Sequence, residues 1–213
     1  MANKEIYRLL SGYRQFRERF YSGEDTTYSK LTNGWQGPKT LIIGCSDSRV
    51  DPAILSSASP GQLFVVRNVA NLVPPFESGG GFHGVSAAIE FAVINLKVEN
   101  IIILGHRQCG GIRALLFPES TQTGGFVQQW VAIAEKAKVR AIGLVGSEDQ
   151  NVLWRQCELE SIRTSLDNLR LFPFVRDATE TGHLSLHGIY FDIENGELLE
   201  LSQETGLYSA IDV

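Results

Sequence analysis

Two short apolar runs constrain the fold of this chain more than any other feature. Residues 41–43 and 101–104 are rich in isoleucine, and each run is followed by glycine and then by side chains that can bind metal or exchange protons. Runs that do not alternate between apolar and polar residues are typical of strands buried on both faces of a parallel sheet. Open sheets of this kind bind ligands at the carboxyl ends of their strands. The sequence therefore predicts an α/β fold with a site where these two strands end.

The side chains that follow the two runs form a possible metal-ligand set. Cys45 and Asp47 follow the first run, and His106 and Cys109 follow the second. If the two strands are neighbours, these four side chains converge on one small volume. Two thiolates, an imidazole and a carboxylate suit zinc. Three protein ligands with an open fourth position are typical of a catalytic zinc site, whereas four are typical of a structural one, so the role of Asp47 decides between them.

Arg49, two residues after Asp47, favours the catalytic alternative. A guanidinium can bind a carboxylate through two parallel hydrogen bonds and keep it ionised. Asp47 would then be withheld from the metal and could accept a hydrogen bond from a metal-bound water. We therefore expect Cys45, His106 and Cys109 to hold zinc, and Asp47 and Arg49 to be the catalytic residues.

The remaining pattern predicts a single domain over residues 1–213. Apolar residues at helical spacing predict amphipathic helices over 3–20 and 152–171, and Cys157 lies on the apolar face of the second. Four strands are expected, over residues 40–44, 62–67, 100–104 and 184–193. The Asn-Gly turn at 195–196 should return the chain to an antiparallel strand at 198–201. We expect a central, mostly parallel sheet flanked by helices, with an antiparallel edge strand and an N-terminal helical arm.

Charge and composition exclude several classes of function. Nineteen basic and 24 acidic residues give a net charge of −5, so the chain lacks the basic surface typical of nucleic-acid-binding proteins. No apolar run approaches the roughly 20 residues of a membrane span, and the first residues lack the apolar stretch of a signal peptide. Three cysteines, two of them in the strand-end motifs, favour metal binding in a reducing compartment over a disulfide. We therefore expect a cytoplasmic protein without nucleic-acid or membrane partners.

Three segments of the chain carry a family signal that is specific in combination. They are Cys-Ser-Asp-Ser-Arg at 45–49, Gly-Gln-Leu-Phe-Val-Val-Arg-Asn-Val-Ala-Asn at 61–71, and Gly-His-Arg-Gln-Cys-Gly-Gly at 105–111. With these segments the chain resembles the β-class carbonic anhydrases over nearly its whole length. The resemblance implies reversible hydration of carbon dioxide to bicarbonate and a proton through a zinc-bound hydroxide, with one Zn²⁺ per subunit. It also implies a homo-oligomer, a dimer or a tetramer.

The resemblance assigns a substrate pocket as well. It implies that Gln36 donates a hydrogen bond to a substrate oxygen, that Phe64 and Val69 form apolar walls, and that Gly110 lies beside the metal loop. Phe91 stands near a family position that is often tyrosine, so the apolar wall is kept and the hydroxyl is lost. In the family, the glutamine and the phenylalanine that correspond to Gln36 and Phe64 come from the neighbouring subunit.

The N-terminal arm, residues 1–34, has an apolar helix face that needs a partner. That partner is either its own domain or another subunit, and the subunit-spanning pocket of the family favours the second. Members of the family in which the aspartate moves onto the metal carry tryptophan three residues before the first cysteine and lack the glutamine. Here Ile42 and Gln36 occupy those positions, so we expect Asp47 to stay paired with Arg49.

Two other functions remain open on the sequence. The same zinc site could hydrolyse a linear analogue such as carbon disulfide. The fold could also serve as a zinc-stabilised binding or sensor module without turnover. That module predicts a missing ligand or a broken aspartate–arginine pair, and the sequence keeps both.

Overall fold

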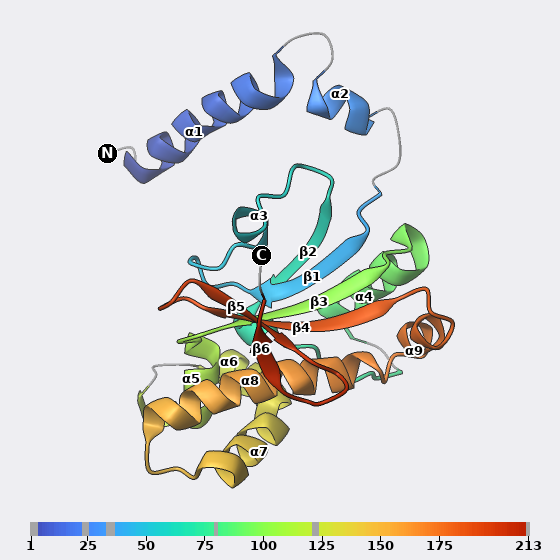
Figure 1. Ribbon diagram of the computed structural model, residues 1–213. Helices are drawn as coiled ribbons and strands as arrows, with labels where there is room; N and C mark the ends of the chain where they lie inside the picture. Colours follow the sequence, from blue (N-terminus) through green and yellow to red (C-terminus); the bar gives the residue numbers. More distant parts are fainter. Residues whose placement is uncertain (1–3, 23–25, 33–36, 79–80, 121–123, 212–213) are drawn as a thin grey trace.

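The computed structural model describes residues 4–22, 26–32, 37–78, 81–120 and 124–211. Within them the strands form one sheet in the order β2-β1-β3-β4-β5-β6 (Figure 1). The strands are β1 (Thr40–Cys45), β2 (Leu63–Asn68), β3 (Asn100–His106), β4 (Ser185–Asp192), β5 (Glu197–Leu201) and β6 (Tyr208–Ala210). The first four are parallel, and β5 and β6 are antiparallel. The predicted α/β fold with a mostly parallel sheet is confirmed, and its antiparallel edge has two strands instead of one.

Helices flank this sheet, and α5 to α8 gather on one side of it (Figure 1). The helices of the described residues are α1 (Lys4–Tyr21), α2 (Thr27–Thr32), α3 (Pro52–Leu55), α4 (Gly84–Glu90), α5 (Gly110–Leu116), α6 (Gly125–Val131), α7 (Glu135–Val145), α8 (Gln150–Leu169) and α9 (Pro173–Glu180); α1 and α2 belong to the N-terminal arm. α4 is followed directly by a π-helical turn, Phe91–Leu96. None of the helices in the described ranges is long and apolar enough to cross a bilayer.

The strand order places the predicted site at a topological switch point. β1 lies between β2 and β3. From β1 the chain therefore runs to β2 on one side and then returns past β1 to β3 on the other side. The register pairs Gly44 with Leu104, which brings the ends of β1 and β3 to the same edge. Ligands of open α/β sheets bind in the crevice that such a reversal creates.

Two glycines let α8 lie unusually close to the sheet. A Cβ atom added at Gly105 of β3 would lie 2.6 Å from Ile162 Cδ1, and one at Gly188 of β4 would lie 2.8 Å from Ile162 Cγ2. Ile162, on α8, is fully buried in the core between this helix and the sheet. The close approach holds α8 beside the loop that follows β3.

The N-terminal arm is helical, as predicted, and stands away from the sheet (Figure 1). α1 has no buried residue, and its apolar side chains Ile6, Leu9, Leu10 and Tyr13 are all more than half exposed. Leu31 of α2 lies against the turn that precedes β2, because a Cβ atom added at Gly61 would be 2.6 Å from its Cδ2. The packing of this arm on a partner subunit remains a prediction.

Candidate metal centre

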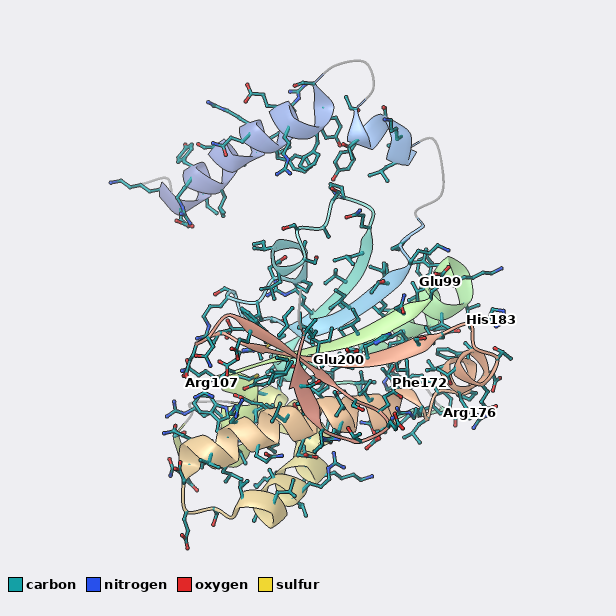
Figure 2. All side chains as sticks on the ribbon, viewed as in Figure 1. Glu99, Arg107, Phe172, Arg176, His183 and Glu200 are labelled. Atoms are coloured by element: carbon teal, nitrogen blue, oxygen red, sulfur yellow. The ribbon has the colours of Figure 1, made fainter. Side chains whose placement is uncertain are left out.

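The structure brings Cys45, His106 and Cys109 together at the predicted edge of the sheet. Their ligand atoms all lie within 4.8 Å of one another, and all three residues are buried. Cys45 ends β1, His106 ends β3, and Cys109 directly precedes α5. In Figure 2 the label of Arg107, the residue after His106, marks this edge of the sheet. Glu99, which precedes β3, lies at the opposite end of the strands.

The geometry of the three side chains fits zinc. The sulfur atoms of Cys45 and Cys109 are 3.9 Å apart, and two thiolates on a tetrahedral zinc lie about 3.8 Å apart when each Zn–S bond is about 2.3 Å. Nδ1 of His106 is 2.8 Å from the carbonyl oxygen of Arg107, which fixes the ring. Its Nε2 is buried and finds no hydrogen-bond partner in the part of the chain that the structure describes. That nitrogen is therefore placed to bind a metal.

The two thiols also have the electrostatics of a metal-ligand pair. The hydrogen bond with Cys109 lowers the pKa of Cys45, whereas the same interaction, together with burial, raises the pKa of Cys109. Two thiolates 3.9 Å apart would repel each other, so holding both sulfurs ionised needs a cation beside them. A divalent metal ion would supply that charge.

Asp47 and Arg49 form the bidentate pair that the sequence predicts. Arg49 Nε donates to Asp47 Oδ1 at 2.9 Å, and Arg49 Nη2 donates to Asp47 Oδ2 at 2.7 Å. These bonds hold the pKa of the Asp47 carboxyl well below its usual range. Among the described residues, the group of close ligand atoms does not include Asp47. The carboxylate is thus ionised, oriented and held apart from the three metal ligands.

Several residues that support the site were not found from the sequence. Arg67 of β2 donates to the carbonyl oxygens of Cys45 and Asp47 and to the carboxylate of Asp51, which fixes the loop after β1. Glu158 of α8 accepts a hydrogen bond from the backbone of Cys109, and burial raises the pKa of its carboxyl to about 7. Arg67 ends a predicted strand and lies in the family segment 61–71, but neither signal assigned it a role, and Glu158 gave no signal.

Val69 and Gly110 lie near the turn that carries Cys109, and their part in a substrate pocket stays a prediction. Gly110 is the first residue of α5, next to Cys109. Val69 packs against the same turn, because a Cβ atom added at Gly111 would lie 2.7 Å from Val69 Cγ1. On its outer side Val69 borders an apolar hollow of about 340 Å³, which is also lined by Phe126 and Trp130.

Phe64 and Phe91 lie away from the metal ligands of the same chain. Their rings pack together with centroids 5.9 Å apart. Phe64 pairs with Leu41, four residues before Cys45 along β1, which corresponds to about 13 Å of strand. A single chain therefore does not bring these two aromatic residues to its own metal ligands, and Gln36 lies outside the described residues.

Comparison with known proteins gives a family for this fold and site. Residues 40–198 match the family model for carbonic anhydrase. A carbonic anhydrase of Synechococcus elongatus is 32% identical over 206 residues, which cover 96% of this chain and 75% of that protein. β carbonic anhydrase 5 from the chloroplast of Arabidopsis thaliana is 39% identical over 178 residues, which cover 83% of this chain and 58% of that protein.

Solved structures agree with this result. The β-carbonic anhydrase CcaA is 33% identical, with a TM-score of 0.89 over 99% of this chain and 94% of that chain. A tetrameric β-carbonic anhydrase of the filamentous ascomycete Sordaria macrospora is 28% identical, with a TM-score of 0.80 over 98% of this chain and all of that chain. The chain belongs to the β-class carbonic anhydrases, and carbonate dehydratase is the activity that this membership assigns to it.

Proposed function

We propose that this chain hydrates carbon dioxide to bicarbonate and a proton with zinc held by Cys45, His106 and Cys109. The observation that carries the proposal is the convergence of these three buried ligands while Arg49 holds the carboxylate of Asp47 apart from them. Zinc with three protein ligands and an open position makes water acidic enough to act as a nucleophile, as in the carbonic anhydrases with three histidine ligands.

The surrounding residues supply orientation and shielding. Asp47, kept ionised by Arg49, is a hydrogen-bond acceptor for the attacking water and can fix its direction. The hydrogen bond between His106 Nδ1 and the Arg107 carbonyl leaves Nε2 without a proton, so that it can bind the metal. Val69 offers an apolar wall on which carbon dioxide, which has no net dipole, can bind without displacing polar contacts.

Stopped-flow measurement of carbon dioxide hydration, with metal analysis of the same samples, tests the proposal. Cys109→Ala deletes a charged ligand, so zinc content and turnover should be lost together. Cys157→Ser is the matched control, because Cys157 is also a fully buried cysteine but lies in the interior of α8 and does not belong to the ligand group. A Cys109→Ala protein with stoichiometric zinc and full turnover would remove this thiolate from the site.

The proposal includes a homodimer, or a tetramer built from dimers, in which two chains line each pocket. Phe64 and Phe91 lie away from their own metal ligands, β2 is an edge strand of the sheet, and the apolar face of α1 is exposed. These features suit a dimer in which Phe64 lines the metal site of the neighbouring chain. In the same dimer the apolar face of α1 would pack on the surface of that neighbouring chain. The tetrameric Sordaria relative supports the same assembly.

Mixed oligomers test the shared pocket directly. Phe64→Ala chains keep their metal ligands, and Cys109→Ala chains keep Phe64. If each pocket is shared, unfolding and refolding the two variants together yields mixed dimers with one complete site, and activity rises above that of either variant alone. No gain on mixing, or a fully active monomer by light scattering, would contradict the shared pocket.

We also propose that the protein works in the cytoplasm. The sulfur atoms of Cys45 and Cys109, 3.9 Å apart, are well beyond the roughly 2.05 Å of a disulfide, and metal binding needs them reduced. Cell fractionation with antibody detection tests this location, and recovery of the protein in a secreted or membrane fraction would contradict it.

A further inference from the structure

Two side chains of α8 bond the backbone of the metal ligand Cys109 itself. Trp154 Nε1 donates to the carbonyl oxygen of Cys109 at 3.1 Å, and Glu158 Oε1 accepts from its N–H at 2.8 Å. Trp154 and Glu158 are four residues apart, so they project from the same face of the helix. We call this pair of residues the α8 clamp. One turn of one helix thus holds both backbone polar groups of a single residue.

Glu158 places a carboxyl group in the buried interior beside Cys109, which is unfavourable for folding. Glu158 is only 2% exposed. Its second carboxyl oxygen, Oε2, accepts a hydrogen bond of 2.8 Å from the hydroxyl of the fully buried Tyr190. No salt bridge to Glu158 occurs in the described part of the chain. Burying a carboxyl group away from water costs free energy in either protonation state, and the two hydrogen bonds that the side chain of Glu158 makes offset part of that cost. One of these two hydrogen bonds is the one from the backbone N–H of Cys109.

The backbone at Cys109 needs such support. The preceding residue, Gln108, has a left-handed conformation with φ of 58°, which side chains other than glycine adopt at some cost in free energy. With the N–H and the carbonyl of Cys109 both held, the direction of its Cα–Cβ bond is fixed, and only rotation about that bond moves the sulfur. The position of the thiolate relative to Cys45 and His106 then follows from the placement of α8.

We propose that the α8 clamp positions Cys109 for zinc, so that Trp154 and Glu158 are positioning residues of the metal centre. This inference rests on the zinc site proposed above. Partners that orient the ligands of a metal site typically change metal affinity by about 10- to 100-fold when they are removed. Part of the zinc affinity is thereby set by residues 45 and 49 positions away in the sequence from Cys109.

Competition for zinc between the full-length chain and a chromophoric chelator at neutral pH tests the clamp without any measurement of turnover. Glu158→Ala should weaken zinc binding by about 10- to 100-fold. Glu158→Gln keeps an oxygen that can accept the N–H of Cys109, so its affinity should lie between those of Glu158→Ala and the wild type. Trp154→Phe should cost only about 2- to 10-fold, because the carbonyl of Cys109 still accepts from the N–H of Arg113 at 3.0 Å.

Cys157→Ala is the matched control, because Cys157 is buried between the two clamp residues along α8 but lies outside the clamp. It should lower the thermal midpoint and leave zinc affinity unchanged, which separates positioning from general destabilisation. Wild-type affinity in both Glu158→Ala and Trp154→Phe would overturn the clamp. If Glu158→Ala does not fold, wild-type affinity in both Glu158→Gln and Trp154→Phe has the same meaning. A wild-type chain that binds no zinc would overturn the proposed function and the clamp with it.

Discussion

Replacing Arg49 by alanine tests how the site uses Asp47. The change removes two charge-assisted hydrogen bonds, of 2.9 and 2.7 Å, that hold the carboxylate. Bonds to charged groups contribute about 1.5–3 kcal/mol each when shielded. The Arg49 side chain is 47% exposed, so solvent screening reduces each bond to about 0.5–1 kcal/mol. The orientation of Asp47 therefore weakens by about 1–2 kcal/mol, which corresponds to about a 5- to 30-fold loss in kcat/KM.

Stopped-flow kinetics on protein of known zinc content measures this loss. Zinc content should not change, because the side chain of Arg49 donates to Asp47 and Gln108 and to none of the three ligands, and the α8 clamp still holds the backbone of Cys109. Removing Arg49 lets the lowered pKa of Asp47 rise toward its ordinary acidic value, so the carboxylate stays ionised near neutral pH and the loss should not vary with pH there. Arg49→Lys keeps the charge without the bidentate geometry and should be intermediate. Wild-type kcat/KM in fully zinc-loaded Arg49→Ala would refute the role of the pair.

Three further expectations concern packing, reactivity and assembly. Gly105→Ala should destabilise the chain by about 1–3 kcal/mol in denaturant unfolding, because its Cβ atom would lie 2.6 Å from Ile162 Cδ1 and 2.8 Å from Ile162 Cγ1. Ile162→Val removes Cδ1 but keeps Cγ1, so it should recover only a small part of that loss. It should recover none of the loss in Gly188→Ala, whose nearest contact, Ile162 Cγ2 at 2.8 Å, valine also keeps. A Gly105→Ala chain as stable as the wild type would contradict the close approach of α8. Burial raises the pKa of Cys157 to about 12, so a thiol reagent should label it in the zinc-loaded protein only on unfolding, and rapid labelling of the folded protein would count against its burial. Deleting residues 1–34 should shift the oligomer toward smaller species in light scattering, and an unchanged oligomer would remove the arm from the interface.

The metal-ligand group could be predicted from the sequence because its ligands lie at or just after the ends of two recognisable buried strands. Cys45 ends one buried run and His106 ends another, and neighbouring parallel strands end at the same edge of a sheet. The sequence left open whether these two strands are neighbours, and the register that places Leu104 beside Gly44 shows that they are. The Asp47–Arg49 pair is likewise separated by a single residue, so its short loop leaves few arrangements.

The supporting residues could not be predicted, because they reach the site through the packing of distant elements. Trp154 and Glu158 lie on a helix whose apolar pattern predicts burial but does not say which loop it covers. Their contact with Cys109 depends on Gly105 and Gly188, which allow α8 to approach the sheet. β6 was missed for another reason, since a strand of three residues is too short to show a periodic pattern.

Stepwise addition of zinc to metal-free protein, with the carbon dioxide hydration rate measured at each step, tests the central claim most directly. Cys45, His106 and Cys109 form one ligand group per chain within the described residues. The rate should therefore rise in proportion to bound zinc up to one ion per chain, remain constant beyond that ratio, and fall again when a chelator removes the metal. Hydration at full rate by the metal-free chain, or one tightly bound zinc per chain without hydration, would contradict the account.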